Sequence, residues 1–554
     1  MKRDRSRQST IVVALTCAFL FCVLSASLRI TASEAANAAS AKPPTVERLD
    51  NTLTLDNLVR GWLRIPTLEH SNVGLEIMEV PSGRVLYSFN GNRRYTPAST
   101  VKAITCACAY DTLGGAYTYK TTVIADGTFS GTTLNGNLVI VPSQNPTFGR
   151  GQLAGLIKDA IQATSRLTGS GTISDITGQI KIAPTGAGDM GFHQAWLVED
   201  WGRHWMPVAS NLVLDRNLGS PGELGVSYRV VDAANTHGSL FDTLLNSPDG
   251  PTWVNVDRSN HTALTYRPKH PQAPKQPSFA MSNPDEYNLA LAELMVKRNG
   301  VRIGNQEIPP SANINQLAAH ESKPLAEIIR TCLHESDNLY AQQLLRTIGA
   351  TTLKTETAPA GKSTERNSSM SLEARGLIAM SKWLSKIGVN GQEVILFDGC
   401  GLCRKNAVSP HALDTVLKHM AGEKADGPYL GLLKQNDESS VGKGTYQFKT
   451  GTMESVRCIA GILKTAGNQK LAVTIMVNGH TPTIRNLRIA ESALINQLRS
   501  IKQIGQAVPK DPVGSASDPN IVETTHEPIV VDHAAAKRTP KPVLKRPRAT
   551  RKHR

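Results

Sequence analysis

The stretch "TPASTVKAIT", residues 96–105, places Ser99 just ahead of an apolar run and Lys102 three residues later. Residues 101–113 carry the apolar pattern of a mostly buried helix that starts near Ser99. Because positions i and i+3 of a helix lie on one face, we expect the hydroxyl and the amine to meet. A serine becomes a nucleophile when a neighbouring base takes its proton, and a neutral lysine amine can be that base. The stretch therefore predicts a Ser–Lys catalytic pair.

The second motif is Ser336-Asp337-Asn338, inside "HESDNLYAQQLLR". Its hydroxyl can relay a proton, and its amide can hold the lysine amine or a substrate carbonyl. The same triplet is also a suitable helix N-cap, and that structural role is compatible with catalysis. We expect Ser336 and Asn338 to join Ser99 and Lys102 in one site.

The third motif is Lys449-Thr450-Gly451-Thr452, inside "YQFKTGTMES", on a predicted strand. Gly451 lets a substrate backbone lie close, Lys449 adds positive charge, and the hydroxyls of Thr450 and Thr452 can bind a carboxylate. Alone, the S-x-x-K pattern is a weak signal. The combination of three motifs in this order indicates a serine hydrolase that forms an acyl-enzyme.

The remaining pattern predicts an α+β fold, in which one helix-and-sheet domain is split by an insertion. Helical or strand-like periodicity marks the segments 46–63, 73–77, 85–89, 285–298, 324–347, 370–387, 410–420, 446–479 and 484–501. Short strand-like runs such as "NLVIV" and "GQIKIA", separated by turn residues, are typical of a β-rich insertion. We place the first part of the domain at 45–118, the insertion at 119–282 and the second part at 283–502.

The motifs, together with the stretches around them, carry a resemblance to a known family. Those stretches are "YTPASTVK", "ASNLVLDRN", "SDNLYAQQLLRTIG", "FDGCGLCRKNAVSP" and "FKTGTMESVRCIAG". Over roughly residues 46–502 the chain resembles the low-molecular-mass class C penicillin-binding proteins, the D-alanyl-D-alanine carboxypeptidase/endopeptidase family. The resemblance implies a β-lactamase/transpeptidase-like domain, with an antiparallel sheet flanked by helices and extra domains between the first two motifs.

The family's functional residues are implied at matching positions. They are the acylated nucleophile Ser99, its base Lys102, the second-motif pair Ser336 and Asn338, and the substrate-binding strand Lys449, Thr450, Gly451 and Thr452. The backbone N–H groups of Ser99 and Thr452 would form the oxyanion hole. The implied activity removes terminal D-alanine from peptidoglycan stem peptides or cuts D-alanyl cross-links, without metal or cofactor and with β-lactams as covalent inhibitors. A non-catalytic peptidoglycan-binding envelope protein and a β-lactam hydrolase are the alternatives.

Three stretches depart from the family pattern. Cys400 and Cys403 stand where serines are common, Asn145-Pro146-Thr147 replaces G-D-P-T, and the segment 421–444 is short. The cysteines outside the leader, which also include Cys106, Cys108, Cys332 and Cys458, allow up to three disulfides, and their spacing leaves the pairing open. Because no second C-x-x-C is near, small buried residues or a local disulfide are favoured over zinc at 400–403. The G-x-G-x-x-G match at 186–191 lacks a βαβ context, which argues against a dinucleotide site.

The two ends of the chain predict export and surface contact. Residues 1–38 combine basic residues, an apolar run and small residues, which is the pattern of a signal peptide or an uncleaved anchor. We therefore expect an exported protein of the periplasm or cell envelope. The net charge of +15 is concentrated at 534–554, where nine lysines and arginines accompany no acid. Within a disordered tail, 503–554, this segment would contact anionic envelope polymers or lipid headgroups, and no nucleic acid is predicted.

Overall fold

The computed structural model describes residues 55–185, 193–197, 200, 203–219, 229–230, 256–257, 262–263, 279–281, 284–351, 370–422, 426–436, 444–480, 484–502 and 504. The predicted leader 1–38, the first part of the helix expected at 46–63 and the glycine pattern 186–191 lie outside these residues. The predicted tail 503–554 lies outside them as well, except for Ile504.

A six-stranded antiparallel sheet brings the two halves of the first domain together. Its strands, in spatial order, are β16 (Lys434–Gln435), β17 (Tyr446–Met453), β18 (Val456–Lys464), β19 (Lys470–Asn478), β1 (Asn72–Glu79) and β2 (Val85–Phe89). The register runs from Asn72 opposite Asn478 to Glu79 opposite Leu471, so the N-terminal hairpin completes a sheet built by the C-terminal strands. β18 and β19 are buried almost throughout, because helices cover both faces.

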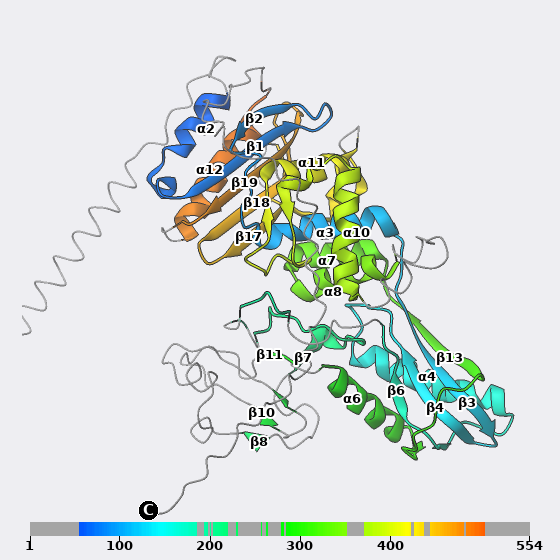
Figure 1. Cartoon of the computed structure of the whole chain (residues 1–554). Helices are drawn as coiled ribbons and strands as arrows, with labels where there is room; N and C mark the ends of the chain where they lie inside the picture. The colour runs from blue at the N-terminus through cyan, green and yellow to red at the C-terminus, as the bar shows by residue number, and fades with distance from the viewer. Residues whose placement is uncertain are drawn as a thin grey trace, which may run out of the picture. The chain divides into compact units, whose positions relative to one another are not determined.

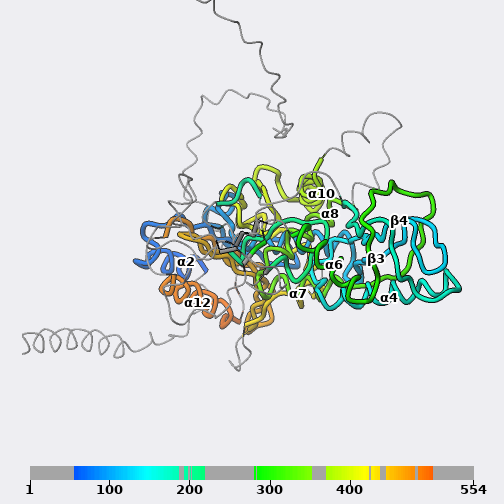
Figure 2. Tube along the Cα trace, turned by 90° about the horizontal axis from the view of Figure 1, so that it is seen from below, coloured from blue at the N-terminus to red at the C-terminus, as the bar shows by residue number. Residues whose placement is uncertain are grey.

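Two hydrophobic layers cover the faces of this sheet (Figure 1). On one face pack α2 (Leu55–Leu63) and α12 (Ile484–Ser500), which lie side by side in Figures 1 and 2. Trp62 on α2 joins them by donating from Nε1 to the carbonyl of Ala490, at 2.9 Å. The helices of the other face are α3 (Val101–Leu113), α7 (Leu325–Glu335), α8 (Asn338–Thr351), α10 (Leu372–Lys386) and α11 (Pro410–Ala421). The candidate site lies on this second face.

The insertion has its own sheet and its own hydrophobic core. Its strands are β3 (Lys120–Ser130), β4 (Thr133–Val141), β5 (Asp175–Ile176), β6 (Ile180–Ile182), β12 (Arg302–Ile303) and β13 (Ile314–Glu321). Two helices pack on it, α4 (Arg150–Thr168) and α6 (Pro284–Arg298). Two small groups of strands follow, β7 (Leu218–Gly219) with β11 (Phe279–Ala280), and β8 (Arg229–Val230), β10 (Thr262–Ala263) and β9 (Val256–Asp257).

Short elements complete the described chain. They are the 3₁₀ helices η1 (Pro66–Leu68), η2 (Ala98–Thr100), η4 (Asp215–Asn217), η7 (Gly391–Glu393) and η8 (Pro428–Leu432), and the pair β14 (Val394–Ile395) and β15 (Ala407–Val408). Among them, η2 and the β14–β15 loop bear directly on the site.

The α+β fold and the antiparallel sheet flanked by helices are as predicted, but two details of the predicted organisation differ. The boundary at 283 is too early, because α6 packs in the core of the insertion and β13 pairs with β3. The pattern at 285–298 does predict a helix, but it cannot show which core that helix joins. We place the return to the first domain near residue 322. The helix α4 is missing from the prediction of a β-rich insertion, although Leu153, Ile157 and Ile161 are spaced along one face.

Candidate active site

Ser99 lies where η2 meets α3, on a backbone that two other segments approach closely. Ala98, just before it, has a φ of 48°, in the left-handed region that non-glycine residues rarely adopt. A side chain at Gly401 would place its Cβ 1.9 Å from the Ala98 carbonyl oxygen. A Cβ at Gly451 would lie 2.8 Å from the Ser99 nitrogen and 2.6 Å from the Pro97 oxygen. Glycine at both positions therefore lets the loop after β14 and the strand β17 pack against the Ser99 backbone.

Lys102 is fully buried one turn into the helix, and the nitrogen at its end reaches three oxygen atoms. The Nζ atom lies 3.0 Å from Ser99 Oγ, 2.6 Å from Asn338 Oδ1 and 2.7 Å from the Cys400 carbonyl oxygen. Two of these partners are carbonyl oxygens, which can only accept hydrogen bonds, so two N–H groups point at them. In a neutral amine the remaining position is the lone pair, and it faces the Ser99 hydroxyl. This geometry suits proton removal from Ser99.

The second motif bridges two helices with an unusual backbone. α7 ends at Glu335 and is followed by the C-cap Ser336, whose φ of 58° is left-handed, and α8 begins at Asn338. Asp337 accepts a hydrogen bond from the Tyr340 backbone at 3.0 Å, so the helix-capping role belongs to Asp337. Ser336 and Asn338 are thereby left to face the two lysines. The predicted continuous helix at 324–347 is wrong at this point, because the periodicity of apolar residues does not reveal a single left-handed residue.

Lys449 extends from β17 toward the second motif. Its Nζ donates to Ser336 Oγ and to the Thr450 carbonyl, both at 2.9 Å, and the residue is only 3% exposed. Burial, and to a smaller extent the nearby charge of Lys102, lower the pKa of Lys449 to about 7. A buried lysine whose pKa lies near neutral pH is typical of functional sites.

The structure brings most of the expected site residues together, but the side chains of Thr450 and Thr452 lie on the other face of their strand. Ser99, Lys102, Ser336, Asn338, Lys449 and the backbone of Gly451 form one contiguous group. Along β17, Thr450 and Thr452 alternate with Lys449 and Gly451, so their side chains leave the strand on the face toward α12. There Thr452 Oγ1 accepts a hydrogen bond from Arg457 Nη1 at 3.0 Å.

The loop between β14 and β15 is organised by Asp398, a residue to which the sequence assigned no role. Its buried carboxylate accepts five hydrogen bonds of 2.6–3.2 Å, from the backbone of Cys400, Gly401 and Cys403 and from the side chains of Trp196 and Asn406. These bonds hold the Cys400 carbonyl against Lys102. The only hint of this role in the sequence is an acidic residue in a glycine-containing loop, because a carboxylate can accept hydrogen bonds from several N–H groups of a turn.

The six described cysteines are free and buried, so no disulfide joins them. Cys400 and Cys403 therefore act as small buried residues, which was one of the two favoured alternatives, and burial raises the pKa of both thiols. Within the described ranges, no group of three or more His, Cys, Asp or Glu residues is suited to hold a metal ion.

The insertion also reaches this site, through residues that the sequence did not single out. Asn338 Nδ2 donates to the carbonyl of Trp205, which fixes the orientation of the amide whose oxygen holds Lys102. The Trp205 side chain is 38% exposed and its Nε1 bonds Asp200 at 3.0 Å. Nearby, Arg216 pairs with Asp337 at 3.1 Å. The signals in the sequence are the tryptophan-rich composition around 196–205 and, for Arg216, the stretch "ASNLVLDRN".

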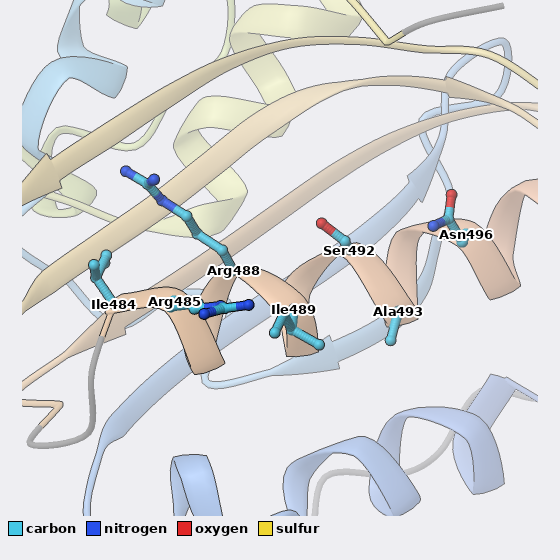
Figure 3. A pocket seen from close by; sticks show the side chains of 7 residues that line it. All are labelled: Ile484, Arg485, Arg488, Ile489, Ser492, Ala493 and Asn496. Atoms are coloured by element: carbon cyan, nitrogen blue, oxygen red, sulfur yellow. The ribbon is translucent and has the colours of Figure 1, made fainter. Parts of the chain in front are cut away.

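A shallow pocket lies elsewhere, on the outer side of α12. Figure 3 shows its lining, which includes Arg488, Ile489 and Asn496 and comes from this helix alone. α12 covers the face of the sheet opposite α3, so this pocket does not belong to the Ser99 group. The chemistry therefore points to the Ser99 region and not to this pocket.

The arrangement defines a class of protein: a serine hydrolase in which a buried lysine replaces histidine, with a second Ser–Lys pair beside an antiparallel β-strand. The chain belongs to the D-Ala-D-Ala carboxypeptidase 3 (S13) family, whose family model matches residues 55–498. It is accordingly a serine-type D-Ala-D-Ala carboxypeptidase, as the resemblance implied.

Curated relatives agree with this assignment, and a solved structure shares the fold. The chain is 26% identical over 444 residues to the D-alanyl-D-alanine carboxypeptidase DacB of Haemophilus influenzae, covering 74% of this chain and 86% of the relative. It is 26% identical over 463 residues to the D-alanyl-D-alanine carboxypeptidase of Actinomadura sp. strain R39, covering 76% and 80%. The fold matches the crystal structure of penicillin-binding protein 4 (dacB) from Haemophilus influenzae, with a TM-score of 0.62, 21% identity and coverage of 80% and 100%.

Proposed function

We propose that the protein acts on peptidoglycan stem peptides through an acyl-enzyme on Ser99, removing terminal D-alanine or cutting D-alanyl cross-links. The observation that carries this proposal is the environment of Lys102. Its amine is held by two carbonyl oxygens and directs its remaining position at the Ser99 hydroxyl. The relatives' names supply the substrate class, which the geometry alone does not specify.

In acylation, Ser99 Oγ attacks the carbonyl carbon of the scissile D-alanyl bond while its proton passes to neutral Lys102 Nζ. The carbonyl oxygen becomes an oxyanion, for which the backbone N–H groups of Ser99 and Thr452 are the proposed donors. The close approach of Gly451 to the Ser99 nitrogen supports this role, because it places β17 directly beside the nucleophile. Collapse of the intermediate breaks the C–N bond and leaves an ester on Ser99.

The second Ser–Lys pair is the proposed proton donor for the leaving amine. Ser336 Oγ is hydrogen-bonded to Lys449 Nζ, so a proton given up by the hydroxyl can be replaced by the ammonium. Asn338 holds Lys102 from the same motif. Acylation leaves Lys102 protonated and Lys449 neutral, so the proton on Lys102 must pass to the Ser336–Lys449 pair before the second step. In deacylation, water then attacks the ester carbon and gives its proton to neutral Lys102 Nζ, and this proton is delivered to the Ser99 oxygen as the ester bond breaks.

The substrate is proposed to lie along β17. Among the described residues, β16 pairs with this strand only at Gln447 and Phe448, so the edge from Lys449 onward is open on that side. An extended peptide can add to such an edge through backbone hydrogen bonds. Lys449 would then attract the terminal carboxylate of the peptide. β-Lactams would occupy the same place, and the Haemophilus penicillin-binding protein 4 has also been solved with a β-lactam.

Export to the cell envelope is part of the same proposal. The supporting observation is the signal-like pattern of residues 1–38, which fits a substrate that lies outside the cytoplasm. None of the helices among the described residues combines the length and hydropathy that crossing a bilayer demands. The basic segment 534–554 is proposed to contact anionic polymers or headgroups. If it does, deleting this segment weakens salt-sensitive binding to anionic vesicles, whereas unchanged binding contradicts it.

The test is intact-mass analysis of the processed protein with a penicillin and, separately, with a D-Ala-D-Ala peptide. We expect a long-lived penicilloyl adduct together with release of D-alanine from the peptide. An adduct without peptide hydrolysis would favour the non-catalytic wall-binding alternative. Rapid loss of penicillin over many turnovers would favour the β-lactam hydrolase.

A further inference from the structure

A buried ion pair lies directly behind the third motif. Arg457 on β18 donates from Nε and Nη2 to the two carboxylate oxygens of Glu491 on α12, both at 2.7 Å. The two side chains are only 9% and 6% exposed. This is the bidentate geometry in which a guanidinium and a carboxylate fix each other's position. Glu491 therefore holds the Arg457 side chain in one orientation.

The remaining end of Arg457 points at the third motif. Arg457 lies opposite Thr452 in the β17–β18 register, and its Nη1 donates to Thr452 Oγ1 at 3.0 Å. Cross-strand partners share one face of a sheet, so the contact follows from the register itself. A continuous chain of hydrogen bonds thus runs from α12 through β18 to β17.

The direction of these hydrogen bonds constrains the Thr452 hydroxyl. Arg457 can only donate, so the hydroxyl oxygen is the acceptor in this contact. The hydroxyl proton is then free to be donated to another group, and Thr452 is exposed. Thr452 lies three residues beyond Lys449 on the open edge of β17, and its side chain leaves the other face of the sheet. A hydroxyl fixed as a donor at this edge is matched to an acceptor that carries negative charge. A terminal carboxylate has this chemistry.

Stability does not by itself explain the pair. The surrounding layer between the sheet and α12 is apolar, including Ile459, Leu487 and Leu494. In such a layer, replacing a buried ion pair by well-packed hydrophobic residues is often neutral or stabilising. A pair of apolar residues could not donate an oriented hydrogen bond to the Thr452 hydroxyl, whereas the ion pair does.

We propose that Arg457 and Glu491 are positioning residues that fix the Thr452 hydroxyl as a donor to the substrate's terminal carboxylate, and so set the preference for substrates that end in a free acid. The inference rests on the proposed function and adds two residues to it. Neither residue touches the reacting atoms, because both act through Thr452.

The experiment compares an acylated D-Ala-D-Ala peptide with the same peptide ending in a carboxamide. The variant is Arg457→Gln with Glu491→Gln, because a neutral pair leaves no unpaired buried charge. We expect the acid-to-amide ratio of kcat/KM to fall about tenfold, the size of one charge-assisted hydrogen bond, with a much smaller change for the amide. Arg499→Gln is the matched control, because Arg499 is another buried arginine at the α12 interface that bonds Gly444 and Asn496, away from the motif. Its ratio should be unchanged.

A double-mutant cycle with Thr452→Val separates positioning from general loss of packing. If Arg457 acts through the hydroxyl, the ratio in the combined variant equals that in Thr452→Val alone. Additive losses, or an unchanged ratio in the Gln/Gln variant, overturn the inference even if that variant is less stable. The wild-type rate keeps the two proposals apart: a wild-type protein that hydrolyses neither peptide refutes the proposed function, whereas an active one with an insensitive ratio refutes only this inference.

Discussion

The two faces of the central sheet bury cations in opposite ways. On the α3 face, Lys102 and Lys449 contact only neutral oxygen atoms, and among the described residues neither forms an ion pair. On the α12 face, Arg457 is bound by both oxygens of Glu491. All three residues are almost completely removed from water.

The difference shows that the hydrogen-bonding partners of a buried basic side chain decide whether it can transfer protons or only hold a structure in place. Lys449 is buried without a carboxylate partner, and its pKa is lowered to about 7, which suits a group that gives up and takes back a proton. A guanidinium clamped by a carboxylate keeps its charge and its place, which is what an oriented donor needs. The lysine face is therefore suited to move protons and the arginine face to hold geometry.

The largest expected effect comes from removing the amine of Lys102 on the α3 face. Lys102→Met keeps similar length and removes the amine, so we expect penicillin acylation to slow about 10³-fold. The measurement is the rate of adduct formation by mass spectrometry or rapid mixing. The Arg457→Gln/Glu491→Gln variant serves as the contrast and should slow acylation far less. Acylation by Lys102→Met within tenfold of wild type would remove Lys102 from the role of base.

The next effect tests the contact between β17 and the nucleophile. Gly451→Ala would place a methyl group 2.8 Å from the Ser99 nitrogen, and backbone atoms cannot yield as a flexible side chain can. We expect kcat/KM to fall about 10²-fold through misplacement of the strand. Gly155→Ala is the control, because its added Cβ meets nothing within 4 Å in an exposed part of α4. Equal activity of both variants would contradict the close approach.

The dependence on pH should differ between Lys449, which titrates near neutral pH, and Arg457, which does not. With a pKa of about 7, Lys449 loses its proton as pH rises through this value, and with it the attraction for a carboxylate. We expect the acid-to-amide ratio of kcat/KM to fall about tenfold across pH 6–8. Because the same catalytic base acts on both peptides, its titration changes both kcat/KM values equally and does not alter their ratio. The contribution of Arg457 stays constant in this range, because guanidinium does not deprotonate. A flat ratio refutes the role of Lys449.

The smallest effect concerns a partly exposed cation, the side chain of His411, which pairs with the buried carboxylate of Glu76. The hydrogen bond from His411 Nδ1 to Glu76 Oε1, at 2.6 Å, raises the pKa of His411. A raised folded-state pKa stabilises the protein fully below the unfolded value, and this stabilisation disappears as pH rises through the folded value. His411→Gln should therefore cost about 1 kcal/mol near pH 5.5 and less at pH 9, as measured by denaturant unfolding. A loss that is equal at both pH values is inconsistent with this pair.

The sequence predicted the general architecture, and most of the residues to which it assigned the chemistry lie together in the structure, while their roles stay predictions. Ser99 and Lys102 share a helix, so their contact follows from local geometry. The strands at 446–479 and the helix at 484–501 were visible because their apolar residues repeat with the period of each element. The fold class followed from the motif set and the resemblance that it carries.

The remaining features depend on contacts between distant segments, which periodicity does not encode. Asn338 meets Lys102 across 236 residues, and Arg457 meets Glu491 only because α12 packs on β18. The left-handed backbone of Ser336 breaks a helix whose apolar pattern continues through it. The role of Asp398 depends on five partners that converge only after folding.

The most direct measurement is to locate the penicilloyl group by peptide mass mapping of the acylated wild-type protein, with Ser99→Ala run in parallel. The account predicts one modified peptide, with the added mass on Ser99, and no labelling of the variant. A penicilloyl group on any other residue, or undiminished labelling of Ser99→Ala, would contradict the claim that Lys102 activates Ser99.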